Sequence, residues 1–175
     1  MIFRNRLFFG LLLMLVAFSG CQRDDICPES TQTTSLLIIR FYDVDDRVTF
    51  QSPTNLQIKA VGDTTVYTND LFNTDSLAIP LRTDADVTSY EFTFNYAEGD
   101  DIDPDSPVEQ NNTDTLTFSY IRDQEYLNRA CSFKINYSEL DVETEAGEDG
   151  AWIQAYQIEQ EEVTNETEAH LSLYY

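Results

Sequence analysis

The sequence YEFTFNY, residues 90–96, carries an aromatic side chain at every second position and a polar side chain between each pair. Successive side chains of a β-strand point to opposite faces, so this spacing places all the rings on one face and the polar groups on the other. The stretch therefore predicts a β-strand with one aromatic face packed on a core and one polar face toward solvent.

The same period of two recurs along most of the chain after residue 35. No window longer than two turns shows a helical stripe, and only residues 122–130 favour a short helical turn. Pro80 predicts an edge strand or a bulge, because proline cannot donate a ladder hydrogen bond. The strands that we expect cover residues 35–42, 56–60, 64–68, 77–81, 90–96, 116–120, 131–137, 152–158 and 169–175. They predict an all-β fold, an antiparallel β-sandwich that is immunoglobulin-like in general architecture, with a closed β-barrel as the alternative.

The first 20 residues have the layout of a secretory signal peptide. Arg4 and Arg6 make the start basic, an apolar stretch covers residues 7–18, and the small residues Ser19 and Gly20 follow. A transmembrane helix needs about 20 apolar residues, so the shorter stretch favours export over a permanent membrane span. We therefore assign residues 1–20 to a signal peptide.

A cysteine, Cys21, follows this segment directly. Residues 18–21, FSGC, resemble the lipobox of bacterial lipoproteins, whose cysteine receives a diacylglyceryl group on its thiol and an acyl chain on its freed amine. The resemblance implies a lipoprotein signal peptide and attachment to a membrane through lipidated Cys21, since several acyl chains anchor a protein stably. The alternative is a secreted protein in which Cys21 has no such role.

The four residues after the cysteine, QRDD, resemble a signal that sends lipoproteins of one group of Gram-negative bacteria to the outer face of the outer membrane. This resemblance gives Gln22, Arg23, Asp24 and Asp25 the role of an export signal, and it implies a lipid-anchored protein on the cell surface. The periplasmic face of the membrane is the alternative, with these residues serving as a flexible acidic tether. We assign residues 21–34 to a lipidated tether and residues 35–175 to a single β-sandwich domain.

Two further cysteines, Cys27 and Cys131, form an even pair once Cys21 is assigned to lipid. Exported proteins mature in an oxidising compartment, where a disulfide is the default, although two free thiols remain an alternative. If successive strands alternate in direction, Cys131 begins its strand at the end of the domain where Cys27 leads into the first strand. A Cys27–Cys131 bridge is then geometrically feasible. The loops 43–54, 97–113 and 138–150 would lie at the opposite end.

The chain is strongly acidic, and removal of residues 1–20 lowers its formal net charge from −22 to −24 because two arginines are lost. Such a charge repels phosphate backbones and excludes nucleic acid as a partner. Asp101, Asp103 and Asp105 have the spacing that begins a calcium-binding loop, but Ser106 and Asn112 replace the glycine and glutamate that such a loop requires. Calcium is therefore a possible cofactor, and a solvated acidic rim is the alternative reading.

Catalytic motifs are few. His170 is the single histidine, which excludes multi-histidine zinc sites, and its alternation with apolar neighbours predicts a surface position. No nucleophile elbow or glycine-rich phosphate loop accompanies it. Acidic residues are too numerous for a glycosidase pair to be chosen from sequence. We expect a protein that is not an enzyme and binds no obligatory cofactor, with a carboxylate-dependent hydrolase as an alternative.

The chain from CQRDDIC through SLAIPLR and YEFTFNY to the terminal AHLSLYY resembles a family of β-rich bacterial lipoproteins of unknown function. The resemblance carries no assigned activity and no catalytic residues. We expect a non-catalytic binding or scaffolding module of the outer membrane, with an outer-membrane barrel protein as a candidate partner and Tyr42, Trp152 and Tyr174 as candidate exposed contacts. A calcium-dependent recognition module that uses the distal acidic loops is the second hypothesis.

Overall fold

A computed structural model describes residues 26–62, 71–98, 105 and 110–175. These residues form eight strands and no helix. The strands are β1 (Leu37–Tyr42), β2 (Gln57–Ala60), β3 (Ser76–Ile79), β4 (Val87–Phe94), β5 (Asn112–Asn128), β6 (Ser132–Ala146), β7 (Ala155–Ile158) and β8 (Leu171–Tyr174). No helix that is long and apolar enough to cross a membrane occurs in these residue ranges.

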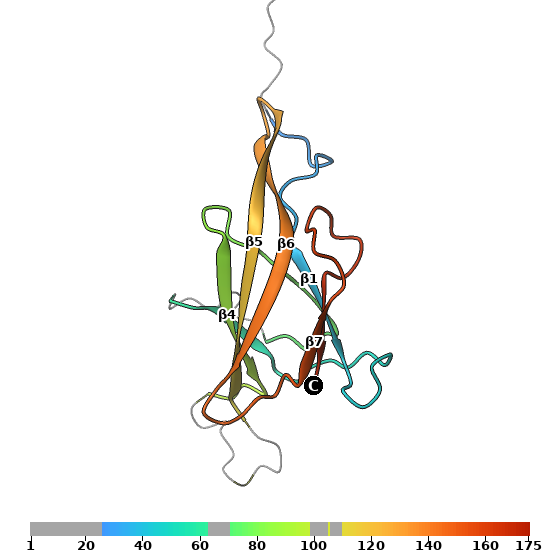
Figure 1. Cartoon of the computed structure of the whole chain (residues 1–175), viewed down its shortest axis with the longest axis vertical. Coiled ribbons are helices and arrows are strands. Elements are labelled where there is room, and N and C mark those ends of the chain that lie inside the picture. The colour runs from blue at the N-terminus through green and yellow to red at the C-terminus, as the bar shows by residue number, and fades with distance from the viewer. Residues whose placement is uncertain (1–25, 63–70, 99–104, 106–109) are drawn as a thin grey trace, which may run out of the picture.

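The strands form two four-stranded sheets that pack face to face (Figure 1). Sheet 1 has the strand order β3-β1-β8-β7, and sheet 2 has the order β2-β4-β5-β6. Because the strands remain in two separate layers, the prediction of an all-β sandwich is confirmed and the closed barrel is excluded. One pair departs from the expected antiparallel pattern, since β1 and β8 run parallel, whereas all the other paired strands are antiparallel.

The aromatic stretch that predicted a core strand forms most of β4. Tyr90 and Phe92 are buried in the core, and the half-buried Phe94 stacks on Trp152 with ring centroids 5.3 Å apart. Asn95 has a φ of 51°, in the left-handed region, and ends the strand, so Tyr96 lies beyond it. The core face was thus predicted correctly, but the strand begins three residues earlier and ends two residues earlier than expected.

Strand β1 supplies the opposite wall of the core. Leu37, Ile39 and Phe41 have no exposed surface and point between the sheets. Burial of each such side chain stabilises the fold by roughly 1.5–3 kcal/mol. The edge position predicted from Pro80 is also confirmed, because β3 is the outermost strand of sheet 1 and ends at Ile79.

The longest elements are β5, with 17 residues, and β6, with 15, which form one antiparallel hairpin. This hairpin corrects two expectations: residues 122–130 contain no helical turn, and residues 138–146 are strand rather than loop. The backbone N–H and C=O groups of these polar residues form hydrogen bonds between the two strands, so they do not need a helix to find partners. The hairpin end projects beyond the sandwich, whereas the 43–54 loop and the 147–150 turn lie at the opposite end (Figure 1).

Candidate functional site

A disulfide joins Cys27 to Cys131 across 104 residues of sequence, with the two Cα atoms 4.7 Å apart. Cys131 lies in the turn between β5 and β6, so the bridge ties the N-terminal segment to the projecting hairpin end. Asn128 shapes this turn, because its Oδ1 accepts hydrogen bonds from the backbone amides of Ala130 and Cys131 at 2.9 and 2.8 Å. Ser132, with a φ of 59°, completes the reversal. The predicted bridge is therefore confirmed.

The segment after Cys27 is also held on the domain by hydrogen bonds. Gln32 Nε2 donates to the Thr164 carbonyl at 2.6 Å, and the hydroxyl of Thr34 accepts from the backbone amide of Ile135 at 2.9 Å. These contacts join residues 32–34 to β6 and to the loop before β8. The end of the predicted tether is thus docked on the sandwich.

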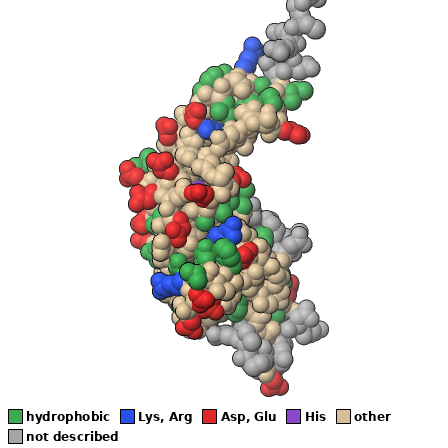
Figure 2. Space-filling model, turned by 90° about the vertical axis from the view of Figure 1, so that its right-hand side faces the viewer, with side chains coloured by type: hydrophobic (Ala, Val, Ile, Leu, Met, Phe, Trp, Pro, Cys, Tyr) green, Lys and Arg blue, Asp and Glu red, His purple; other side chains and the backbone are tan. Residues whose placement is uncertain are grey.

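Apolar side chains are exposed around the disulfide. Tyr126 and Phe133 face each other across the hairpin with ring centroids 5.2 Å apart, and they are 58 % and 53 % exposed. Ile26, next to Cys27, is 74 % exposed. We call residues 26–30 and 126–133 the hairpin tip. Figure 2 shows hydrophobic side chains gathered at this projecting end, above a body with many acidic side chains.

Several predicted site residues lie outside the residues that the structure describes. These are Cys21, Gln22, Arg23, Asp24, Asp25, Asp101 and Asp103. Asp105 is described and is exposed in a turn. Lipidation, the export signal and the calcium loop therefore remain predictions from the sequence.

The described acidic residues of the distal end have local structural roles. Asp43 Oδ1 accepts hydrogen bonds from the backbone amides of Asp45 and Asp46 at 2.7 and 3.0 Å, which shapes the loop after β1. Across the described parts of the chain, no group of three or more histidine, cysteine or acidic side chains is arranged to hold a metal ion.

The expected surface position of His170 is wrong. The imidazole is buried, and its Nδ1 accepts a hydrogen bond from the backbone amide of Ile38 at 2.9 Å. Burial lowers the pKa of His170, against the opposing effects of the Asn165 backbone and Glu166. His170 directly precedes β8 rather than lying within it, and all four residues of this central strand of sheet 1 are buried, so the position is covered. The role of His170 is to accept a hydrogen bond from the backbone amide of Ile38 in β1.

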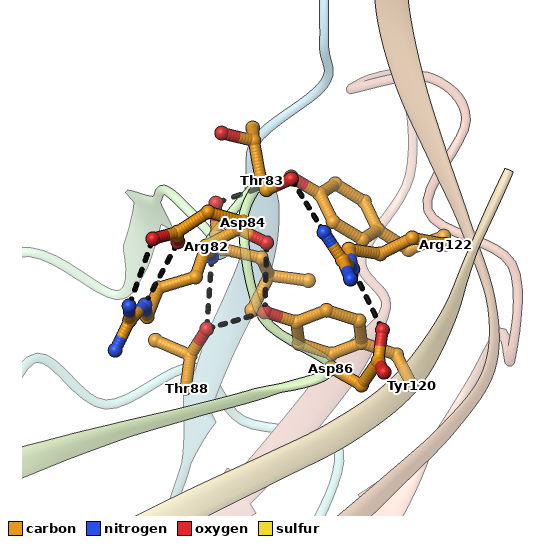
Figure 3. A network of polar contacts seen from close by, with 9 residues as sticks. Arg82, Thr83, Asp84, Asp86, Thr88, Tyr120 and Arg122 are labelled. Carbon is orange, nitrogen blue, oxygen red and sulfur yellow. Dashed lines mark hydrogen bonds and ion pairs between the residues drawn. The ribbon is translucent and has the colours of Figure 1, made fainter. Parts of the chain in front are cut away.

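A network of charged side chains lies where the chain crosses from β3 in sheet 1 to β4 in sheet 2 (Figure 3). Arg82 donates from Nε and Nη2 to the two carboxylate oxygens of Asp84, at 3.0 and 2.9 Å. These hydrogen bonds hold the pKa of Asp84 below its usual range. Arg122 of β5 donates to Asp86 at 2.6 Å and to the Thr83 carbonyl at 2.7 Å. Exposed ion pairs stabilise a protein little, so the network chiefly fixes the path of the crossing segment.

Three tyrosines of sheet 2 hold the same segment. The hydroxyls of Tyr90, Tyr137 and Tyr120 donate to the carbonyls of residues 80, 81 and 82, at 2.7, 3.1 and 3.0 Å. Burial raises the pKa of Tyr137 to about 12. Each strand of sheet 2 after β2 thus contributes one hydroxyl to one of three successive carbonyls. This arrangement leaves the hydroxyls engaged in structural hydrogen bonds.

One carboxylate, Asp114 of β5, is buried in the sandwich. Its Oδ2 accepts hydrogen bonds from the backbone amides of Trp152 and Ile153 at 3.0 and 2.7 Å. Its Oδ1 makes no well-formed hydrogen bond, although the backbone amide of Gly147 helps to lower the pKa of the carboxylate. Burial raises the pKa of Asp114, and the three amides oppose the increase. Asp114 lines none of the three described surface depressions.

Cation and aromatic contacts cover the outer face of sheet 1. Tyr42 stacks on Tyr174 with centroids 5.6 Å apart and packs against Phe50 at 4.9 Å. Arg40 lies 5.0 Å above the Phe50 ring, and Arg47 lies 4.7 Å above the Tyr174 ring. We call these five residues the arginine–aromatic surface. Phe50 is its most accessible ring, with 51 % of its surface exposed.

Two of the three aromatic residues that we expected to be exposed contacts are buried. Tyr174 lies beneath Arg47, and Trp152 packs in the core. The indole Nε1 of Trp152 donates to the Phe92 carbonyl at 2.9 Å, which satisfies the polar end of the ring. Tyr42 is half-buried.

A comparison with known protein families matches residues 55–175 to a family of unknown function, DUF6452. The matched range contains the strands from β2 to β8 and Cys131, whereas β1 and Cys27 precede it. The search of curated proteins and the search of solved structures each returned no match. Because the matched range covers more than half of its length, the chain belongs to the DUF6452 family of unknown function.

Proposed function

We propose that the protein is a surface-exposed outer-membrane lipoprotein that acts as a non-catalytic binding or scaffolding module. In this proposal Cys21 carries the lipid, and residues 22–25 direct export to the outer face. The proposal combines the lipobox resemblance of the N-terminal sequence with one structural observation, the disulfide between Cys27 and the hairpin end.

The disulfide supports the proposal because it limits how far the domain can move from a lipid at Cys21. Cys27 follows Cys21 by six positions in the sequence. A fully extended chain covers at most about 3.5 Å per residue, so the segment spans no more than about 21 Å. A lipid on Cys21 would therefore hold the hairpin end near the bilayer, and the loops at the other end of the sandwich would be free to meet a partner.

A protein partner fits the chemistry of the remaining surface better than nucleic acid does. The chain without residues 1–20 carries a formal net charge of −24, because the loss of Arg4 and Arg6 lowers the total of −22 by two, and it repels polyanions. The arginine–aromatic surface combines two cations with an accessible ring, a composition that is enriched at protein interfaces. An integral outer-membrane barrel protein is the partner class that we propose.

The polar groups of the sandwich support a non-catalytic role. A carboxylate hydrolase needs a carboxyl group of raised pKa in a cleft that substrate can enter. Asp114 has a raised pKa, but it lies in the interior, and its Oδ2 is engaged by backbone amides. His170 and Tyr137 are likewise buried and bonded to backbone groups.

The test of lipid attachment is metabolic labelling of producing cells with an alkyne fatty acid, followed by isolation of the protein. We expect the native chain to be labelled and the Cys21→Ser variant to remain unlabelled. An unlabelled native chain would refute the lipoprotein assignment. A Cys27→Ser, Cys131→Ser double variant is the matched control, because it removes the two other cysteines and should keep its label.

The test of surface exposure is protease treatment of intact cells that produce either the native chain or an Asp24→Ala, Asp25→Ala variant. We expect only the native chain to be digested, and both chains to be digested after permeabilisation. Digestion of neither chain in intact cells would place the protein on the periplasmic face. Digestion of both would show that the two aspartates are not needed for export.

A further inference from the structure

We infer that the hairpin tip is a membrane-contact site, with the rings of Tyr126 and Phe133 resting among the lipid headgroups. This inference rests on the proposed lipid attachment at Cys21, and it assigns the tip a role beyond that of a bridge to the tether. The partner is a lipid surface rather than a protein.

The first argument is covalent reach. The tip lies within about 21 Å of chain from Cys21, because Cys27 is bonded to Cys131 in the turn of the hairpin. Strand β5 alone has 17 residues, which at a rise of about 3.4 Å per residue span about 55 Å. The bridge therefore restricts the tip to the neighbourhood of the anchor, while the opposite end of the hairpin can move much farther from it.

The second argument is the chemistry of the exposed side chains. Tyr126 and Phe133 pair on one face of the hairpin and remain more than half exposed, and Ile26 is 74 % exposed beside the disulfide. Farther along the same face, Ile135 and Tyr137 pack on the core, so the apolar face continues past the end of sheet 1. Exposed aromatic rings are favoured at the boundary between lipid headgroups and acyl chains. The face that meets sheet 1 in the body would thus meet lipid at the tip.

The third argument is charge. Residues 126–133 contain one base, Arg129, and no acid, and residues 26–30 contain one acid, Glu29. The tip is therefore neutral in a strongly acidic chain, and Figure 2 shows acidic side chains spread over the body below it. Anionic membrane surfaces repel acidic proteins. The neutral tip can therefore approach an anionic membrane without charge repulsion. The acidic body would be held away from the membrane.

The experiment anchors the chain from Cys21 onward, which contains every described residue, to vesicles by coupling the Cys21 thiol to a maleimide lipid. The disulfide occupies the other two cysteines, so the coupling is selective. The vesicles consist of phosphatidylcholine with brominated acyl chains, which quench tryptophan that reaches the headgroup boundary. The probes are Phe133→Trp at the tip and Val48→Trp, which replaces an 82 % exposed side chain in the 43–54 loop. The parent chain measures the background from the buried Trp152.

We expect the emission of Phe133→Trp to shift to the blue and to be quenched in brominated vesicles, and that of Val48→Trp to be unchanged. Equal emission of Phe133→Trp in brominated and ordinary vesicles would overturn the inference and assign the aromatic pair to solvent or to a protein partner. Equal quenching of both probes would also overturn it, because the domain would then lie on its side. Chemical coupling separates this test from the proposed function: absence of fatty-acid labelling at Cys21 in cells would refute the lipoprotein assignment alone.

Discussion

Removal of the Cys27–Cys131 disulfide should destabilise the domain strongly. The bridge closes a loop with a sequence separation of 104, so it restricts most of the unfolded chain. In the loop-entropy description, a loop of this length stabilises the native state by about 4.7 kcal/mol at 25 °C. For a chain of 150 to 250 residues, each kcal/mol shifts Tm by about 2–4 °C, so we expect a fall of about 9–19 °C.

The assay compares a Cys21→Ser chain, which keeps the bridge and has no free thiol, with a Cys21→Ser, Cys27→Ser, Cys131→Ser chain. Circular dichroism follows thermal unfolding, and urea titration gives the free energy of unfolding and its slope m. We expect Tm and the free energy to fall and m to rise, because the unbridged chain exposes more surface when it unfolds.

The reasoning would be refuted by a loss in the free energy of unfolding below about 1 kcal/mol, since the loop model requires several times that value. Treatment of the bridged chain with a reducing agent provides an independent route to the same state. Its transition should move to that of the serine variant. A reduced chain that unfolds at the original temperature would show that the contacts of residues 32–34 alone hold the N-terminal segment.

Three other substitutions test the interior. Tyr120→Phe leaves the Arg82 carbonyl without its donor and should lower the free energy of unfolding in urea by about 1–3 kcal/mol, whereas the exposed Tyr126→Phe should change it little. Asp114→Ala deprives two buried backbone amides of their acceptor and should cost about 2–4 kcal/mol in the same titration, because loss of the buried charge offsets part of the penalty. The lowered pKa of His170 gives stability that is present above its unfolded pKa of about 6.5 and is lost as pH falls through the folded value. His170→Asn keeps an acceptor near the Nδ1 position but removes the titrating group. The melting temperature of this variant should therefore depend less on pH between about 7 and 5 than that of the native chain. An equal dependence of melting temperature on pH in both chains would contradict the contribution of His170.

The sandwich could be predicted because its buried strands show the period of two directly. Residues 90–94 alternate between rings in the core and polar groups outside, and residues 37–41 supply the facing wall. The far part of β5 gave no such signal, although the facing start of β6 did. Residues 121–128 extend beyond the sandwich, where most side chains are exposed on both faces, so no core imposes an alternation. Backbone pairing with β6 decides their structure, and the sequence of one strand does not show its partner.

The candidate site could be predicted in part. The Cys27–Cys131 bridge followed from cysteine number and strand direction, and both remained valid although β1 and β8 are parallel. The buried position of Asp114 had a signal in its even spacing with Leu116 and Phe118, which point into the core. His170 had none, because its burial depends on the segments that cover β8, and these come from distant parts of the chain.

The three-tyrosine contact with residues 80–82 could not be predicted for the same reason. Each hydroxyl belongs to a different strand, and the carbonyls belong to a connection between sheets. Only the order of strands in both sheets brings these groups together. Alternation places the tyrosines on the inner face, but it does not identify the carbonyls that they contact.

The disulfide also determines how the protein responds to mechanical tension. A force applied between the N-terminal segment and the C-terminus passes from Cys27 to Cys131 through a covalent bond, so the residues between them carry no load. Only residues 132–175, which contain β6, β7 and β8, can be drawn out. At about 3.5 Å per residue, these 44 residues limit the extension to about 150 Å, and the aromatic strand β4 lies inside the protected loop. Under load the domain would therefore lengthen from its C-terminal side only, with residues 28–130 retained as one closed unit.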